Sequence, residues 1–375
     1  MRVSFVSTYT PDECGIATYT SYLAPELKEL NNEIYIISQT GGCGEKVFPS
    51  FSSTDPDLAE KVFEALIKFT PDIVHIQHEY GLFGKDSGVN VIPLLYKLRM
   101  AGIPTVVTLH TVYETFTKPQ EIICGGILNS ADAVIVHQEF QKKALAENIR
   151  ATAKIHVIPH GVRMIEPVPE AKGKLGLSGK KVVLIAGYFR PTKGYDRIVK
   201  IFPEIMKEVP EACLLIAGKA RMQEYSQYRD YFLKLIEDSP AKDSILILRG
   251  QFPQKTFDAI ISAADVSPMP YLLGAQSGIM AHCFAFAKPV VASPLPAFIE
   301  AITRIKGGLI ADTNEEFADA IIRLLKDEKL YGETSQNIRN YVKNHLNWMK
   351  VAEETVKVYQ EIVKVPYGKA RYLEI

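Results

Sequence analysis

Two cations follow a segment with the pattern of a buried strand. Residues 182–186, VVLIA, are apolar and largely β-branched, which is typical of a strand buried on both faces, and Gly187 ends the run. Arg190 and Lys193 come next, in the sequence RPTKG, and an amphipathic helical pattern follows them. Two cations at the carboxyl end of a parallel strand are suited to binding a phosphate or diphosphate. A solvated Arg/Lys pair on a surface loop is the alternative, because short motifs often match by chance.

Two predicted helix starts carry the features of a phosphate site. Gly15 directly precedes a helical pattern in the loop after the first predicted strand. Gln276, Ser277 and Gly278 open an apolar helix in the second half of the chain. Glycine allows a ligand to approach the backbone, and the N-terminal end of a helix favours negative charge. The first loop lacks G-x-G-x-x-G, so a dinucleotide is not indicated. At the second, an ordinary helix capped by Ser277 is the alternative, although capping and phosphate binding use the same geometry.

Histidines stand at the ends of four predicted strands. The segments IVHIQH, TVVTLH, AVIVH and VIPH end in His78, His110, His137 and His160. Ligands bind at the carboxyl ends of the strands in open α/β sheets, so the repetition favours a functional role, although any one of these residues is more commonly structural. A metal site is disfavoured, because His75 and His78 lie on opposite faces of an ideal strand and no carboxylate stands at a recognised ligand spacing.

The composition is that of an ordinary globular protein. The chain has 375 residues, of which 47% are hydrophobic, and this length exceeds what one hydrophobic core usually serves. Lys and Arg balance Asp and Glu at 43 each, so no overall field favours nucleic acid or an anionic membrane, and an anion site must be local. The five cysteines are scattered and form no C-x-x-C, which argues against a disulfide framework and a structural zinc site and favours a cytoplasmic location. No apolar run has the length of a signal peptide or a membrane-spanning helix, and a peripheral membrane contact is left open.

Alternating strand and helix patterns predict the organisation of the chain. They recur from residue 2 to about residue 160 and again from about residue 181 to residue 310. Such alternation implies an α/β fold with a mostly parallel, doubly wound sheet in each half. The Pro- and Gly-rich segment 166–179 is the predicted linker, and the chain after Asn314 is predicted to be helical to about Lys364.

Three segments together resemble one enzyme family. GYFRPTKG, VIPHGV and PMPYLLGAQSGIMAHCFAFAKPVVAS are similar to family 4 of the retaining, sugar-nucleotide-dependent glycosyltransferases, and the likeness extends over nearly the whole chain. The resemblance implies the GT-B fold, in which two Rossmann-like domains face each other across a cleft. It implies an acceptor-side domain at 1–165, a domain that binds the nucleotide sugar at 178–345, and a terminal helix within 346–375 that packs back on the first domain.

The resemblance also implies roles for particular residues. Lys193 and Arg190 would bind the diphosphate, and His110 would lie near hydroxyls of the donor sugar, so these three are the expected catalytic residues. The expected donor-binding residues are Gly15, Gly187, Arg190, Lys193, Gly250, Gln251, Phe252, Gln276, Ser277, Gly278 and His282. The expected acceptor-binding residues are His78, Glu79 and Tyr80. The chain departs from the family's E-x7-E pattern, because His282 occupies the place of the second glutamate and Gly274 that of the first.

The activity that the resemblance implies is retaining hexosyl transfer. Mannose or glucose would move from a GDP- or UDP-linked donor to a hydroxyl of a sugar or another small acceptor, without a cofactor. Two cations and backbone N–H groups would stabilise the charge of the departing phosphate without a metal ion, and no carboxylate pair of the kind used by glycoside hydrolases is needed. The alternatives are a sugar-nucleotide epimerase or glycoside phosphorylase of the same fold, and a non-catalytic sugar-binding protein.

Overall fold

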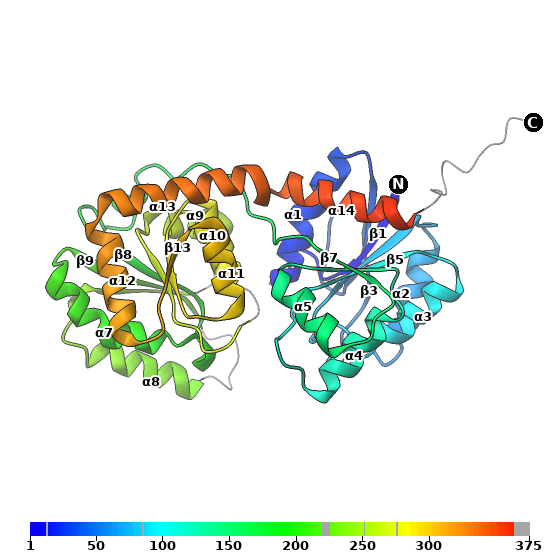
Figure 1. Cartoon of the computed structure of the whole chain (residues 1–375), viewed down its shortest axis with the longest axis horizontal. Coiled ribbons are helices and arrows are strands. Elements are labelled where there is room, and N and C mark those ends of the chain that lie inside the picture. The colour runs from blue at the N-terminus through cyan, green and yellow to red at the C-terminus, as the bar shows by residue number, and fades with distance from the viewer. Residues whose placement is uncertain (13, 85, 220–225, 251, 275–276, 364–375) are drawn as a thin grey trace, which may run out of the picture. The chain divides into compact units, whose positions relative to one another are not determined.

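The chain folds into two compact units. The computed structural model describes residues 1–12, 14–84, 86–219, 226–250, 252–274 and 277–363. The N-terminal unit comprises Met1–Gly161 together with the chain from Leu346 onward, and the C-terminal unit comprises Val162–His345 (Figure 1). The chain therefore passes between the units twice, after Gly161 and after His345.

The N-terminal unit is built on a seven-stranded parallel sheet. The strand order is β3-β2-β1-β4-β5-β6-β7, so the direction of winding reverses between β1 and β4. The strands are β1 (Arg2–Ser7), β2 (Glu33–Gln39), β3 (Val47–Phe51), β4 (Ile73–His78), β5 (Thr105–Leu109), β6 (Ala133–Val136) and β7 (Lys154–Val157). This reversal is a topological switch point, where ligands of open α/β sheets bind.

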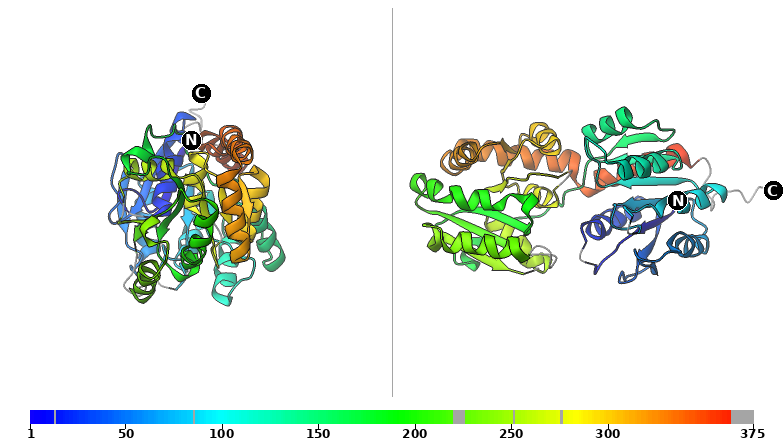
Figure 2. Two further views of the ribbon diagram at one scale, coloured as in Figure 1. Left: turned by 90° about the vertical axis from the view of Figure 1, so that its left-hand side faces the viewer. Right: turned by 90° about the horizontal axis from the view of Figure 1, so that it is seen from below.

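Helices cover both faces of this sheet (Figure 1 and Figure 2). They are α1 (Gly15–Glu29), α2 (Leu58–Ile67), α3 (Val91–Met100), α4 (Lys118–Leu128), α5 (Glu139–Asn148) and α14 (Trp348–Ile362). Successive side chains of β1 enter different cores, because strand residues alternate between faces. Phe5 packs with residues of α1 and α14, and Val6 packs with residues of α2 and α3.

The C-terminal unit repeats the same topology. Two three-stranded parallel sheets, β10-β9-β8 and β11-β12-β13, are joined by a bridge between Val183 and Val266, and the combined order is that of a Rossmann fold. The strands are β8 (Lys181–Tyr188), β9 (Ala212–Lys219), β10 (Ile245–Arg249), β11 (Ser267–Met269), β12 (Val290–Ala292) and β13 (Gly308–Ile310). The switch point of this unit lies between β8 and β11.

The helices of the C-terminal unit follow its strands along the chain. The helices and helical turns are α6 (Ala171–Lys174), η1 (Pro191–Lys193), α7 (Tyr195–Glu208), α8 (Ser226–Glu237), η3 (Lys242–Ser244), α9 (Gln254–Ala263), α10 (Gly278–Ala285), α11 (Pro296–Ile305), α12 (Asn314–Lys326), α13 (Glu328–Tyr341) and the π-helical turn η4 (Val342–Leu346). Helix α7 is the amphipathic helix predicted after the two cations, and it buries Ile198, Val199, Phe202 and Ile205.

Two local features differ from the sequence expectations. Strand β3 was not predicted, because it is a half-exposed edge strand containing Pro49, and a proline inside a run argues against a strand. The segment 166–179 is not the point at which the chain crosses between units. It lies within the C-terminal unit, where Leu177 is buried in the core and the backbone N–H of Val168 donates to Ser262 Oγ at 2.8 Å.

The terminal helix α14 is held on the N-terminal unit by close packing at its first residue. The Trp348 ring packs edge-on against Tyr19 and lies directly over Gly161, where an added Cβ atom would overlap the indole. We expect Gly161→Ala to lower the free energy of unfolding by about 1–3 kcal/mol, because a methyl group forced into a packed contact must displace its neighbours. Urea unfolding measures this loss.

The matched control is Gly125→Ala in α4, where the new Cβ would have only an ordinary contact, 3.8 Å from Ile149. This control should be neutral or stabilising by up to about 1 kcal/mol, because alanine favours helix more than glycine does. Equal stability of the Gly161→Ala variant and the wild type would contradict the packing argument.

Candidate active site

Two loops meet at the switch point of the C-terminal unit. One follows β8 and carries RPTKG, and the other follows β11 and runs from Pro270 to the start of α10. Gly194 adopts a φ of +59°, and a Cβ atom there would overlap the carbonyl oxygen of Pro270. The N–H of Leu272 donates to the carbonyl of Thr192 at 2.9 Å. Only glycine permits this approach, so the loop that bears the two cations is fixed to the loop that leads into α10.

Lys193 and the start of α10 both contact Tyr271. The Lys193 ammonium lies 3.5 Å from the centroid of the Tyr271 ring, a cation–π contact. The Tyr271 hydroxyl lies 3.3 Å from Ser277 Oγ, which also accepts from the N–H of Met280 as the N-cap of α10. Gly187, at the end of β8, lies beside the first turn of α10, because a Cβ there would be 3.5 Å from Ile279. The structure therefore brings together four predicted donor residues, namely Gly187, Lys193, Ser277 and Gly278.

Arg190 precedes Lys193 in the same loop. Its guanidinium lies 5.9 Å from the centroid of the Tyr188 ring. Within the described residues its buried Nε has no hydrogen-bond partner, and neither Arg190 nor Lys193 forms an ion pair with a carboxylate. Lys193 near the N-terminal end of α10, with a second cation three residues earlier in the same loop, forms an arrangement suited to a phosphate or diphosphate.

The other predicted donor residues lie on neighbouring elements. Gly250 follows β10 with a φ of +140° and open space beside it, and Phe252 packs partly buried against the core of the unit. His282 in α10 is partly buried, with its ring edge-on to Phe257 at 5.1 Å. The predicted residues Gln251 and Gln276 lie outside the described residues.

An ion pair that sequence reasoning missed lies next to His282. Arg163 donates two hydrogen bonds to Asp258, at 2.5 and 3.1 Å. Burial raises the pKa of Asp258, but the hydrogen bonds from Arg163 and Gln254 together lower it by more. The net pKa is therefore below its ordinary value. No spacing signal connects Arg163 to Asp258, so the sequence alone offered no means of finding the pair.

The predicted acceptor residues are the last residue of β4 and the two that follow it, and β4 flanks the switch point of the N-terminal unit. Glu79 accepts hydrogen bonds from Thr111 Oγ1 at 2.6 Å and from the N–H of Tyr80 at 3.0 Å. Burial nevertheless raises the pKa of Glu79 above its ordinary value. Gly15 begins α1 at the same end of the sheet, after the β1 loop, with no atom within 4 Å of an added Cβ.

His110 lies in a buried polar network. Its Nε2 is 2.8 Å from Oε1 of Gln77, and since an amide oxygen only accepts, His110 donates there. Its Nδ1 is 3.4 Å from Nε2 of His137, whose Nδ1 donates to the carbonyl of Ile158 at 3.0 Å. Burial, with a smaller contribution from His137, lowers the pKa of His110 well below its ordinary value. His110 is therefore a neutral imidazole at neutral pH, and its contact with a donor sugar stays a prediction.

The two histidines of β4 point to different faces of the sheet. His75 Nδ1 lies 2.6 Å from the Tyr359 hydroxyl of α14, and its Nε2 lies 2.7 Å from Thr108 Oγ1. His78 instead stacks on Phe83 with ring centroids 5.9 Å apart. Across the residues that the structure describes, no three His, Cys, Asp or Glu side chains are grouped so that they could hold a metal ion.

Two Rossmann-like units, with two cations in the loop at the switch point of the second, define a doubly wound α/β protein. Comparison with known families identifies it further. Residues 168–345 match the family model for group 1 glycosyl transferases, and residues 14–164 match the model for family 4 glycosyltransferases. The chain belongs to this glycosyltransferase family, which confirms the resemblance found in the sequence.

Individual relatives agree with the family. The chain is 26% identical over 401 residues to a phosphatidyl-myo-inositol mannosyltransferase of Mycobacterium leprae, covering 96% of this chain and 97% of that protein. It is similar in fold to sucrose-phosphate synthase from Thermosynechococcus elongatus, with a TM-score of 0.78, 18% identity and coverage of 96% of this chain and 98% of that one. HepE from Anabaena in complex with UDP gives a TM-score of 0.77 at 15% identity, over 96% of this chain and all of that chain. These structures confirm the GT-B fold.

Within the described part of the chain, no helix combines the length and the apolar character needed to cross a membrane.

Buried histidines should make the stability of the protein depend on pH. Burial lowers the pKa of His78 from 6.5 to about 3. Between these two values the unfolded chain binds more protons than the folded one, so stability falls as the pH falls. We expect the free energy of unfolding to fall between pH 7 and pH 5 in the wild type, and to fall by about 2 kcal/mol less in His78→Phe. The substitution removes one titrating group while the ring stacking is retained. Urea unfolding at the two pH values measures the difference.

Phe83→Leu is the matched control. It alters the same ring stack without removing a titratable group, so its loss of stability between the two pH values should equal that of the wild type. A His78→Phe variant with the pH dependence of the wild type would show that burial of His78 does not govern this loss.

Proposed function

We propose that the protein transfers a hexose, mannose or glucose, from a nucleoside-diphosphate sugar to a hydroxyl of a sugar or another small acceptor, with retention of configuration. The observation that carries the proposal is the meeting of Lys193 and the capped start of α10 at Tyr271. The family supports a transferase. The mannosyltransferase relative supports the transfer of a hexose, and the UDP complex of HepE supports a donor linked to a nucleoside diphosphate.

The chemistry requires stabilisation of the leaving group. When the bond between the anomeric carbon and the diphosphate oxygen breaks, negative charge develops on that oxygen. In the proposal Lys193 and Arg190 neutralise this charge, and N–H groups in the first turn of α10 donate to the same phosphates. The acceptor hydroxyl attacks the anomeric carbon, and its proton passes to the departing phosphate on the same face of the sugar. Because the two cations supply the positive charge, the proposal assigns no metal ion to the reaction.

The remaining roles follow from the same assignment. His110 is a neutral imidazole that donates its one N–H to Gln77, so toward the donor sugar it would bring no positive charge and would accept a hydrogen bond from a sugar hydroxyl at Nδ1. Glu79 is the one carboxylate in the proposed acceptor set and would accept a hydrogen bond from an acceptor hydroxyl, as it does from Thr111. His282 would contact the ribose with one donor and one acceptor nitrogen, where a glutamate would accept from two hydroxyls.

A donor panel tests the function. We expect one of the UDP-, GDP- or ADP-linked hexoses to raise the melting temperature, because a ligand at one hundred times its Kd adds about 2.7 kcal/mol of stability. With that donor and a hydroxylated acceptor, the protein should release nucleoside diphosphate and form a glycoside, and turnover should persist after exhaustive chelation.

Other products distinguish the alternatives. Isomerisation of the donor without an acceptor indicates an epimerase, sugar phosphate formed from inorganic phosphate and a glycoside indicates a phosphorylase, and binding without turnover indicates a sugar-binding protein. Activity lost on chelation and restored by magnesium or manganese would refute the metal-independent mechanism.

The two cations should be essential for turnover. We expect Lys193→Ala or Arg190→Ala to lower kcat/KM about a hundredfold or more, because each removes a charge-assisted partner of a desolvated diphosphate. Steady-state kinetics with the donor identified above measures the effect. Lys207→Ala, an exposed lysine in the last turn of α7, is the matched control and should retain the turnover of the wild type. Turnover by Lys193→Ala at the level of this control would exclude the assignment.

A further inference from the structure

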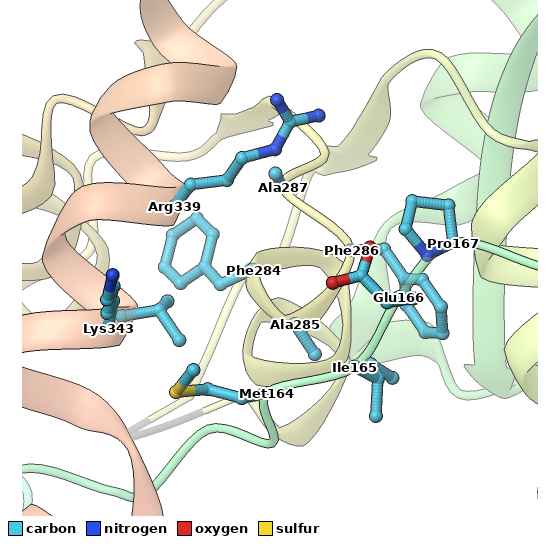
Figure 3. A pocket seen from close by; sticks show the side chains of 11 residues that line it. Met164, Ile165, Glu166, Pro167, Phe284, Ala285, Phe286, Ala287, Arg339 and Lys343 are labelled. Carbon is cyan, nitrogen blue, oxygen red and sulfur yellow. The ribbon is translucent and has the colours of Figure 1, made fainter.

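A groove on the C-terminal unit is separate from the residues of the donor site. Its volume is about 300 Å³, within the lower range of ligand pockets (Figure 3). Three segments form it, namely the chain after the first crossing, the C-terminal end of α10, and the end of α13 with η4. The lining residues are Met164, Ile165, Glu166, Pro167, Phe284, Ala285, Phe286, Ala287, Arg339, Val342 and Lys343.

The groove has an apolar floor. Phe284 and Phe286 are 4% and 3% exposed, so their rings are fixed by packing. Ile165 and Val342 add aliphatic surface, and Met164 lies at the mouth with 59% of its surface exposed. A side chain this apolar and this exposed gains free energy when a ligand covers it.

Cations predominate among the charged lining residues. Arg339 and Lys343 are four residues apart, where α13 ends and η4 begins, and Figure 3 shows them on one helix with Glu166 on the facing segment. Both cations are exposed. Lys288, next to the lining residue Ala287, adds positive charge nearby. Burial lowers the pKa of Lys288 to about 8, and the charge of Arg339 acts in the same direction.

We propose that this groove binds an amphiphilic anion, with its apolar body against Phe284 and Phe286 and its phosphate or carboxylate head at Arg339 and Lys343. Two cations against one carboxylate favour an anionic head, and the apolar lining favours an alkyl or aryl body. The site is additional to the proposed transfer reaction and does not depend on it.

The groove lies close to both points at which the chain passes between the units. Met164 is the third residue after Gly161, and Lys343 is the third residue before Leu346. The ligand would thus contact the polypeptide next to both of its passages between the units. By contacting both segments it would restrain the two connections between the units, since short connecting segments can act as hinges.

Three probes with the same decyl chain test the charge preference. Calorimetric titration of the full chain below the critical micelle concentration should give binding of decyl phosphate, with decanol and decyltrimethylammonium at least tenfold weaker. The double variant R339Q/K343Q should weaken binding of decyl phosphate about tenfold or more. Lys329→Gln, an exposed lysine in α13 outside the groove, should leave it unchanged. Equal binding of decanol, or no binding of decyl phosphate, would overturn the proposal.

Hydrogen exchange locates the ligand. Decyl phosphate should slow exchange in peptides that cover 164–167, 284–287 and 339–343. Protection centred on 187–194 instead, with displacement by nucleoside diphosphate, would place the phosphate in the donor site and refute the groove as its site. Because neither measurement needs turnover, failure of the transferase proposal leaves this result interpretable.

Discussion

The donor site depends on the contact between the RPTKG loop and the segment that follows β11. Gly194 meets the carbonyl of Pro270, and Leu272 donates to Thr192, although these partners are nearly eighty residues apart. The contact is possible because β11 is bridged to β8 at the reversal of strand order. It disfavours the interpretation of Lys193 as a freely solvated surface lysine. A solvated lysine would be mobile, whereas this one lies over the Tyr271 ring beside the start of α10.

Holding the lysine over an aromatic ring has an energetic consequence for anion binding. A cation–π contact is worth about 0.5–2 kcal/mol, less than the several kcal/mol lost when a buried ion pair is broken. Within the described residues Lys193 has no carboxylate partner, so a diphosphate that bound it would have to replace only this weaker contact. The chain as a whole has no net charge, so attraction of the proposed donor would come from this local arrangement and not from a long-range field.

The sequence predicted the elements better than the contacts between them. Apolar runs located nearly every strand, whereas β3 escaped because Pro49 and its exposed face hide the strand pattern. The histidines were correctly grouped at strand ends, but their partners were not predictable. The hydroxyl that binds His75 belongs to Tyr359, 284 residues later, and only the packing of α14 on the N-terminal unit brings the two together. In the same way, Tyr271 joins Lys193 to Ser277 by a geometry that no spacing reveals.

His282 shows how a departure from a family pattern is accommodated by its neighbours. The imidazole lies against Phe257 and contributes, after Arg163, to the low pKa of Asp258. A glutamate at this place would set a second carboxylate near Asp258, and each negative charge would raise the pKa of the other. Histidine removes that repulsion and allows Asp258 to keep its charge beside Arg163. The residue that departs from the family pattern and the ion pair that sequence reasoning missed are therefore neighbours, and a histidine at position 282 is compatible with a charged Asp258 beside Arg163.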